Sequence, residues 1–438
     1  MVYYYYPNLI KRSCIMIPAL NPLVLSLKES ATLAINVTAR KMRAQGAEVY
    51  HFGFGESPFP VPPTIQSALR KNSHQNHYLP TQGLPQLCEA VASFYKDEFG
   101  CRFTPEDVFI GPGSKELIFQ TIYLMEGPLL IPAPSWVSYG PQAALRGKTI
   151  VPVATSRDND YKITPEALDE ACYQLGQSQK LLILNNPNNP TGSVYTDQEM
   201  AQIAEICRAY HIVVISDEIY AMIDFTDKKQ SSMHHYYPEG TIVSGGLSKS
   251  FSAGGYRLGI LMIPDELAIL KQALTSVISE TYSCVSAPIQ YAALAGYSDF
   301  ESIRPFIKTC SQIHDFAGNY LHKRCIDMQL NCPKPQGAFY LFPDFDNYRP
   351  ALKRNNIITG PQLSQHLLEK AHVAVLPASD FYLPATHLGV RMASVDYDGA
   401  VVLTNWPGGD KLSEAQIETL FPNLKKGADA LEQFLDGL

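Results

Sequence analysis

The chain has 438 residues, of which 46% are hydrophobic and 18% are charged, and its net charge is −7 at pH 7. That length is more typical of two domains than of one, and the composition is sufficient for a large buried interior. The negative charge and the absence of Lys/Arg runs argue against a surface that binds nucleic acid. Nine scattered cysteines without a CxxC pair indicate reduced thiols and a cytoplasmic protein, and they give no reason to expect a metal site. The apolar runs have the length of strands, so no membrane span is expected.

The first 300 residues alternate short apolar runs with helical patterns. Four runs without polar alternation are typical of strands buried on both faces of a parallel sheet, and they cover residues 108–110, 129–131, 181–184 and 212–215. Between the last two, Thr196 and Glu199 form a capping-box pattern, and the apolar face of the helix that follows carries Met200, Ile203, Ala204 and Cys207. Thr104-Pro105 and Thr164-Pro165 predict two further helix starts. This alternation predicts an α/β domain with a mostly parallel sheet and helices on both faces.

After about residue 300 the pattern changes. A long helical stretch precedes strand candidates over residues 337–342, 373–376 and 388–393, and a closing helix is expected over about 412–435. These elements predict a smaller α+β domain. We therefore expect an N-terminal arm over residues 1–50 that packs beside this small domain, a large domain over 51–300 and the small domain over 301–438.

Two charged residues follow strand patterns in the large domain. Asp217 comes directly after the run 212–216, and the carboxyl ends of central parallel strands are where open α/β sheets bind ligands. An unpaired carboxylate there would cost several kcal/mol to keep charged, so it needs a cationic partner. Lys249 stands in a loop rich in serine and glycine after the apolar Ile242-Val243. A lysine that attacks carbonyl groups needs a lowered pKa, and Arg257 is a nearby cation that would lower it.

Other residues are ambiguous when they are considered singly. The turn Gly113-Ser114-Lys115 lies between a strand and a helical run, so its N–H groups suit a phosphate. Trp136 is a core residue or a flat surface for a planar ring. Asn189 either shapes its Asn-Pro turn or reaches a cofactor with its amide. Arg391 lies on an otherwise apolar strand, where its guanidinium fits a carboxylate.

Considered together, these residues have the chemistry that pyridoxal 5′-phosphate (PLP) requires. The amine of Lys249 would form a Schiff base with the aldehyde, and Asp217 would keep the ring nitrogen protonated. The guanidinium of Arg257 would bind the phosphate. The phenol of Tyr220, in Ser216-Asp-Glu-Ile-Tyr220, and the amide of Asn189 complete the set.

The chain resembles the class I/II aminotransferases, which are fold-type I PLP enzymes. The motifs that carry this resemblance are His51-Phe-Gly-Phe-Gly-Glu-Ser57, Tyr78-Leu-Pro-Thr-Gln-Gly83, Asn186-Pro-Asn-Asn-Pro-Thr-Gly192, Ser216-Asp-Glu-Ile-Tyr220, Ser248-Lys249 with Arg257, Gly337-Ala-Phe-Tyr340 and Pro377-Ala-Ser-Asp-Phe381. The resemblance implies a homodimer with shared active sites, in which Tyr78 reaches the phosphate of the other subunit. It also implies that Lys249, Asp217 and Tyr220 are catalytic residues.

The same resemblance distributes the remaining roles. The phosphate would be held by Gly113, Ser114, Lys115 and Arg257. Ser248 would lie beside the lysine in the cofactor site, Asn189 and Tyr220 would bind the ring oxygen, and Trp136 would stack on the ring. The substrate would be bordered by Gly55, Trp136, Asn189 and Arg391, with Gly55 and Arg391 at its carboxylate. The implied reaction moves an amino group from an amino acid to a 2-oxo acid by a ping-pong mechanism through a Lys249 Schiff base and pyridoxamine phosphate.

Three departures from the family pattern qualify this expectation. Gly246 stands where many relatives have a hydroxyl residue, Ala378 replaces a usual glycine, and residues 280–283 offer no arginine for a second substrate carboxylate. Alternative functions are another reaction on the same fold, such as a C–S lyase, a decarboxylating enzyme or a cyclising enzyme, and a non-catalytic PLP-binding regulator. The regulator is disfavoured because the chain has no basic helix-turn-helix extension.

Overall fold

The computed structural model describes residues 19–438 except 26, 28–30, 177 and 227–230. Residues 1–18, 26 and 28–30 of the expected N-terminal arm therefore lie outside the described part of the chain. No described helix is both long and apolar enough to cross a membrane.

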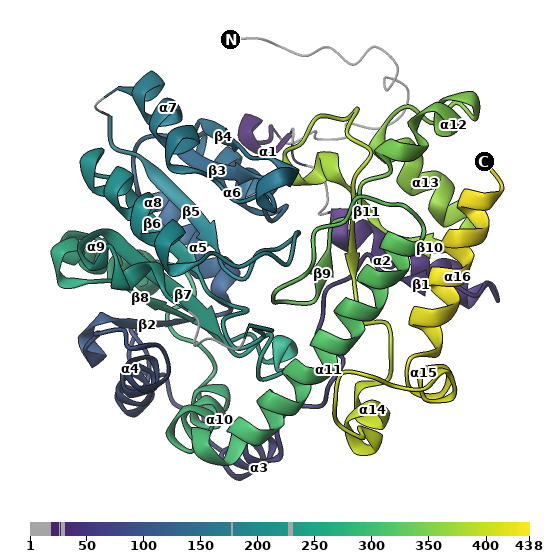
Figure 1. The fold of residues 1–438 in the computed structure, drawn as a ribbon. Coiled ribbons are helices and arrows are strands. Elements are labelled where there is room, and N and C mark those ends of the chain that lie inside the picture. The colour runs from purple at the N-terminus through teal and green to yellow at the C-terminus, as the bar shows by residue number, and fades with distance from the viewer. Residues whose placement is uncertain (1–18, 26, 28–30, 177, 227–230) are drawn as a thin grey trace, which may run out of the picture.

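A seven-stranded sheet forms the centre of the larger part of the molecule (Figure 1). In spatial order its strands are β2 (Val108–Gly111), β8 (Gly259–Met262), β7 (Thr241–Gly246), β6 (Val213–Asp217), β5 (Leu181–Asn185), β3 (Leu129–Ala133) and β4 (Ile150–Ala154). Only β8 runs antiparallel to its neighbours, and the other pairings in the sheet are parallel. The predicted mostly parallel sheet is confirmed, and the four apolar runs lie in β2, β3, β5 and β6.

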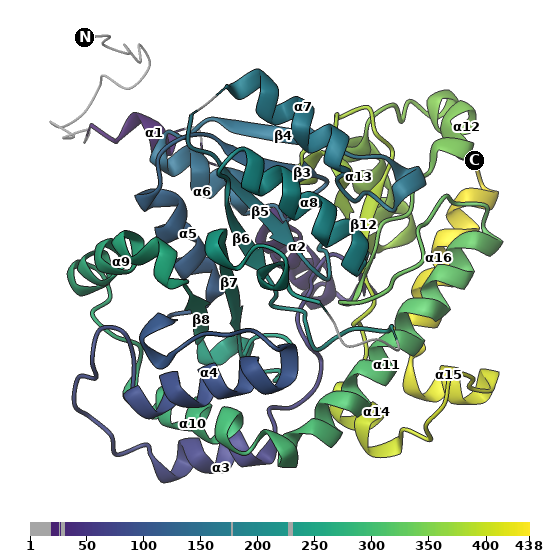
Figure 2. The same cartoon turned by 60° about the vertical axis from the view of Figure 1, so that its left-hand side comes forward.

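Side chains that alternate along the inner strands are buried on opposite faces of this sheet, whereas the edge strand β4 is only partly buried. In β5, Leu181 and Ile183 pack toward one face, whereas Leu182 and Leu184 pack toward the other. The first face is covered by α5 (Ser114–Leu124), α6 (Tyr139–Arg146) and α9 (Ala268–Glu280). The second face is covered by α7 (Pro165–Leu175) and α8 (Asp197–Ala209) over one half, and by α3 (Pro63–Lys71), α4 (Pro85–Phe99) and α10 (Ala287–Ser298) over the other (Figure 2). Burial on both faces explains why the strands carry no polar alternation.

Of the three predicted helix starts, those at Thr164 and Thr196 begin α-helices and the one at Thr104 does not. Thr164 caps α7 by accepting a hydrogen bond from the Ala167 N–H, and Thr196 and Glu199 form the predicted capping box of α8. Thr104-Pro105, however, begins only a 3₁₀ turn over Pro105–Asp107, so the prediction of a helix there was wrong. The physical reason is that Val108 enters β2 directly after the turn, which leaves no length for an α-helix.

The C-terminal part begins with the long helix α11 (Phe300–Asp327). Its three-stranded antiparallel sheet has the order β11 (Leu376–Pro377), β12 (Val390–Ala393) and β9 (Tyr340–Leu341). A separate two-stranded parallel sheet joins β1 (Tyr50–His51) to β10 (Val373–Ala374). The strand predicted over 373–376 is therefore two short strands, β10 and β11, in two different sheets. The remaining helices of this part are α12 (Arg349–Arg354), α13 (Gly360–Ala371), α14 (Gly399–Asn405), α15 (Glu414–Leu420) and α16 (Pro422–Asp436).

The predicted closing helix is divided into two at Phe421. Pro422 cannot donate a backbone hydrogen bond to the preceding turn, so it starts α16 instead of continuing α15. The described end of the N-terminal segment lies against the C-terminal part: α2 (Ala31–Ala44) contacts β11, and Ala39 and Val49 pack with Leu368 and Ala374 (Figure 1). The domain boundaries near residues 50 and 300 stay predictions.

Candidate active site

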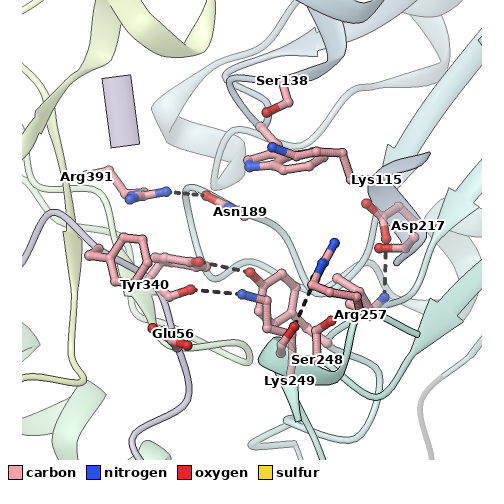
Figure 3. Close-up of a pocket in the computed structure, with 17 residues that line it drawn as sticks. Glu56, Lys115, Ser138, Asn189, Asp217, Ser248, Lys249, Arg257, Tyr340 and Arg391 are labelled. Atoms are coloured by element: carbon pink, nitrogen blue, oxygen red, sulfur yellow. Dashed lines mark hydrogen bonds between the residues drawn. The ribbon is translucent and has the colours of Figure 1, made fainter. Parts of the chain in front are cut away.

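A cavity of about 330 Å³ lies where the carboxyl ends of the central strands meet residues 54–56 and the C-terminal part of the chain (Figure 3). Eleven predicted site residues line it: Gly55, Ser114, Lys115, Trp136, Asn189, Asp217, Tyr220, Ser248, Lys249, Arg257 and Arg391. Six further residues that the sequence did not single out for this site complete the lining: Phe54, Glu56, Ser138, Ile219, Gly254 and Tyr340. The structure thus brings together side chains from positions 54 to 391 around one space.

Lys249 follows the end of β7 and is half-buried in this cavity. Its Nζ donates a hydrogen bond of 2.8 Å to the carbonyl oxygen of Gly55 and lies 5.6 Å from the ring centroid of Tyr220. Burial, followed by the nearby cations Arg391 and Arg257, lowers the pKa of Lys249 to about 8, although the charges of other neighbours oppose the shift. The neutral, nucleophilic amine is therefore much more accessible near neutral pH than in an exposed lysine.

Asp217 is the last residue of β6 and is 3% exposed. Its Oδ2 accepts a hydrogen bond of 2.6 Å from the hydroxyl of Tyr139, and its Oδ1 accepts a long one of 3.4 Å from the N–H of Ile219. Burial raises the pKa of Asp217 to about 6, while the Tyr139 hydroxyl, the Ile219 N–H and the charge of Lys249 act in the opposite direction. A buried carboxylate with one weakly used oxygen is suited to a cationic ligand.

The N-terminus of α5 and Arg257 form a cradle at another side of the cavity. Gly113 precedes the helix with φ +98°, and a Cβ at this position would collide with the Arg257 guanidinium. Arg257 itself is exposed and donates to the carbonyl oxygens of Gly254 at 2.9 Å and Pro112 at 3.2 Å. Helix N-termini present unpaired N–H groups, and together with a guanidinium they bind phosphate well. Lys115 adds a second cation here, and its Nζ lies 5.0 Å from the ring centroid of Trp136.

Arg391 lies on β12 and is 1% exposed. Its guanidinium donates to the carbonyl oxygen of Gly53 at 2.6 Å and to Oδ1 of Asn189 at 3.2 Å, and it lies 4.7 Å from the ring centroid of Tyr340. Its Nε is buried without a hydrogen-bond partner, and no carboxylate of the described residues forms an ion pair with it. A buried guanidinium with an unused donor is a suitable binding site for a ligand carboxylate.

The aromatic lining connects these charged groups. The hydroxyl of Tyr220 lies 2.9 Å from that of Tyr340, and both residues are buried. The backbone N–H of Asn189 donates to Oδ1 of Asn185 at 2.7 Å, which holds the Asn189 turn in place. Trp136 lies at the cavity wall with Tyr139 against it, their ring centroids 5.2 Å apart at 84°.

Two predicted site residues do not line the cavity. Gly113 lies just behind it, at the N-cap of α5. Tyr78 is 91% exposed and lies outside the lining of this subunit's cavity. Sequence reasoning missed Tyr139 and Tyr340 as site residues because buried tyrosines usually belong to the core. The proximity of Tyr139 to Trp136, three residues away, was an available signal for the first, and Tyr340 stands in a quoted motif.

The unusual Gly246 has a backbone explanation. Its φ is +150°, and a Cβ would lie 2.7 Å from the carbonyl oxygen of Leu258. A hydroxyl residue could not adopt this geometry without strain. The absence of a hydroxyl side chain at this position is thus tied to the local backbone conformation.

Comparisons with known proteins agree with this geometry. Residues 47–399 match the family described as aminotransferase class I and II. The chain is 35% identical over 370 residues to an aspartate aminotransferase of Geobacillus stearothermophilus, which covers 82% of this chain and 91% of that protein. It is 33% identical over 375 residues to a bifunctional aspartate aminotransferase and glutamate/aspartate-prephenate aminotransferase of Petunia hybrida, over 83% of this chain and 77% of that protein.

Solved structures give the same result. The aspartate aminotransferase from Thermus thermophilus with maleate superposes with a TM-score of 0.82 at 26% identity, over 95% of this chain and all of that chain. An aromatic aminotransferase from Pyrococcus horikoshii superposes with a TM-score of 0.75 at 26% identity, over 91% of this chain and 99% of that chain. The chain belongs to the class I and II aminotransferase family and is a PLP-dependent enzyme.

The residues present fit this cofactor. The glycine at 113 leaves room for a phosphate at a helix N-terminus beside Arg257. Asp217 offers a buried carboxylate whose hydrogen-bond donors among the described residues are the neutral Tyr139 hydroxyl and Ile219 N–H, and Lys249 offers an amine with a lowered pKa. The phosphate, the ring nitrogen and the aldehyde of PLP therefore each have a chemically matched group at one cavity.

Proposed function

We propose that Lys249 binds PLP covalently in this aminotransferase, that Asp217 pairs with the cofactor's ring nitrogen and that Arg391 binds the substrate's α-carboxylate. The observation that carries this proposal is the shared cavity. It joins an amine of lowered pKa, a buried carboxylate and a buried guanidinium that donates to a carbonyl and an amide oxygen. Asn189 and Tyr220 would bind the ring oxygen, Trp136 would stack on the ring, and Gly113, Ser114, Lys115 and Arg257 would hold the phosphate, with Ser248 beside them.

When bound, PLP supplies an aldehyde that condenses with amines and a cationic ring that withdraws electrons from the substrate's α-carbon. The chain's own residues do the rest. Arg391 binds the α-carboxylate and thereby orients the α-carbon toward Lys249, with Gly55 beside it. The amine of Lys249 would accept the proton from that carbon, and its lowered pKa would keep it available as a base. Asp217 keeps its ionised oxygens toward the ring nitrogen, so that the nitrogen retains its proton.

The substrates are an amino acid and a 2-oxo acid. Aspartate is the first candidate because the relatives quoted above include aspartate aminotransferases. Residues 280–283 are Glu-Thr-Tyr-Ser and provide no arginine for a second carboxylate. If aspartate is the substrate, its distal carboxylate must find another cation, and Lys115 is the basic residue in the lining whose role can be tested separately.

We further propose a homodimer in which Tyr78 completes the phosphate site of the partner subunit. Its 91% exposure supports this, because a tyrosine in this position leaves a large apolar ring uncovered in a single subunit. A reducing compartment such as the cytoplasm is proposed for the protein, since each described cysteine is a free thiol and most are buried.

Borohydride reduction of the PLP-loaded enzyme, followed by peptide mapping, tests the central assignment. The expected result is one pyridoxyl group per chain, on Lys249, and its disappearance in Lys249→Ala. Lys148→Ala serves as the matched control, since it removes a lysine that lies outside this cavity and whose pKa is also lowered by burial, and it should leave the label in place. A label on any other lysine in the wild-type enzyme would refute the proposal.

A further inference from the structure

The hydroxyl of Tyr139 is an unexplained polar group beside the proposed active site. Tyr139 is the first residue of α6 and has no exposed surface. Its ring packs in the core on the first face of the large sheet, with Leu129, Ile131 and Ile183 in the same cluster. A phenylalanine would fill this space equally well, so packing alone does not account for the hydroxyl.

That hydroxyl donates a hydrogen bond of 2.6 Å to Oδ2 of Asp217. Among the described residues, the other hydrogen bond to the Asp217 side chain is the long one of 3.4 Å from the Ile219 N–H to Oδ1. The backbone carbonyl of Asp217 is fixed separately, by Asn185 Nδ2 at 2.8 Å and by the Asn186 N–H at 3.1 Å. Tyr139 is therefore the main restraint on rotation of the Asp217 carboxylate about its Cβ–Cγ bond. A short hydrogen bond to a charged acceptor is among the strongest in a protein.

Tyr139 also contacts the wall on which the cofactor ring is proposed to stack. Its ring meets that of Trp136 edge to face, with centroids 5.2 Å apart. The main chain around both residues is held by Tyr382, whose hydroxyl accepts from the Gly140 N–H at 2.7 Å and donates to the Trp136 carbonyl oxygen at 3.1 Å. Tyr139 is thus fixed at its backbone and at its ring, which makes its hydroxyl a rigid donor.

We propose that Tyr139 is a positioning residue, whose hydroxyl immobilises one oxygen of Asp217 so that the other is presented to the ring nitrogen of PLP. This inference rests on the proposed role of Asp217. Tyr139 would not touch the cofactor's ring nitrogen itself and would act only through the carboxylate.

The charges around Asp217 support the proposal that Tyr139 positions this carboxylate and that the carboxylate pairs with the ring nitrogen. In the described part of the chain, the titratable side chains that interact with its carboxylate are Tyr95, Tyr139, Glu218, Tyr220 and Lys249. Lys249 is the one cation among them, and it is proposed to lose its ammonium charge when it binds the cofactor. In the loaded enzyme the ionised state of Asp217 would then depend on the ring nitrogen and on the Tyr139 hydroxyl, which lowers the pKa of Asp217.

The test compares the binding of two cofactors to cofactor-free protein. One is PLP, and the other is its deaza analogue, in which a C–H group replaces the ring nitrogen. Binding is followed by tryptophan fluorescence, because Trp136 lines the cavity. The wild type should prefer PLP, since only PLP offers a cation to Asp217. Tyr139→Phe should weaken PLP binding roughly ten- to a hundredfold, the range for a lost hydrogen bond to a charged group, and should leave binding of the analogue within about twofold.

Tyr195→Phe is the matched control. Tyr195 is also a buried tyrosine, and its hydroxyl accepts a hydrogen bond of 3.0 Å from the Ile163 N–H, in the core on the second face of the sheet. This variant should lower the melting temperature but keep the wild-type ratio of the two affinities. Melting temperatures of all variants without cofactor separate a loss of stability from a loss of positioning.

Asp217→Ala distinguishes the two proposals. If Asp217→Ala loses the preference for PLP over the analogue, and Tyr139→Phe loses part of that preference, Tyr139 acts through Asp217. If Asp217→Ala loses the preference for PLP but Tyr139→Phe keeps the full wild-type preference, the positioning role of Tyr139 is refuted while the role of Asp217 stands. If neither variant changes the ratio, Asp217 does not pair with the ring nitrogen, and both proposals are refuted.

Discussion

Tyr220 and Tyr340 place their hydroxyl groups 2.9 Å apart, and this contact joins two distant parts of the chain across the cavity. Tyr220 follows β6 of the large sheet, whereas Tyr340 lies on β9 of the C-terminal sheet. The guanidinium of Arg391 lies against the ring of Tyr340 on one side of this contact, and Lys249 lies near the ring of Tyr220 on the other. The groups proposed to bind the substrate and the cofactor are thus connected through two tyrosines.

Arg391→Leu should reduce kcat/KM for every amino acid substrate by a similar factor. Each substrate carries the α-carboxylate, and leaving it unpaired in a buried site should cost about 2–5 kcal/mol. Steady-state kinetics with acidic, neutral and aromatic amino acids check this expectation. Amines without a carboxylate are the internal control and should be affected much less. A loss confined to acidic substrates would mean that Arg391 binds the side-chain carboxylate and not the α-carboxylate, so that the substrate lies in the reverse orientation.

Asp217→Ala should remain loadable with saturating PLP but lose most of its transaminase activity. Without the carboxylate the ring nitrogen loses its proton, and the ring withdraws electrons less strongly from the substrate. Asp217→Asn, which keeps the size of the side chain but not its charge, should behave in the same way. Transamination within about tenfold of the wild type, or roughly 1.4 kcal/mol, would contradict the pairing with the ring nitrogen.

Mixed dimers should reveal whether Tyr78 acts across the subunit interface. A Lys249→Ala subunit paired with a Tyr78→Ala subunit forms one site that has neither residue and another that has both, if Tyr78 belongs to the neighbour's site. Such heterodimers, isolated with two different affinity tags, should recover about half of the wild-type activity. Heterodimers that show no recovery would argue that Tyr78 acts within its own subunit or not at all.

The capture of PLP by cofactor-free protein should depend on pH with a midpoint near the Lys249 pKa of about 8. Only the neutral amine attacks an aldehyde, so the rate should rise as pH increases toward 8 and should level off above it. An ordinary lysine, whose pKa is about 10.4, would still gain rate up to pH 10. Stopped-flow absorbance measures the rate. The same reaction with a blocked lysine derivative corrects for ionisation of PLP itself, and a rate that continues to rise after this correction would contradict the lowered pKa.

Four strands of the large sheet, β2, β3, β5 and β6, were predictable because they are buried on both faces, whereas the only partly buried edge strand β4 was not predicted. The uninterrupted apolar runs of β3 and β5 are the direct result of that burial. The strands of the C-terminal part were predicted less well. β10 and β11 have two residues each, and their pairing with β1 and β12 is decided by contacts between distant segments. Such pairings leave almost no local pattern in the sequence.

The same distinction applies to the site. Asp217, Lys249 and Arg391 could be predicted because a charge at a strand end or on an apolar strand is conspicuous. Tyr139 and Tyr340 could not, because a buried tyrosine in a core and a buried tyrosine with a functional hydroxyl have the same sequence pattern. Only the partner of the hydroxyl, Asp217 or Tyr220, separates the two cases.

The hydrogen bond from Arg391 to the carbonyl oxygen of Gly53 joins residues 338 positions apart in the chain. A chain that ends before residue 391 therefore lacks part of the site, because residues from 53 to 391 are needed to form it. A ligand that needs the whole site stabilises only molecules that have finished folding, and this stabilisation grows with the logarithm of the ratio of its concentration to the dissociation constant. The concentration of free PLP would then influence how much of this protein escapes proteolysis, in addition to how fast it works.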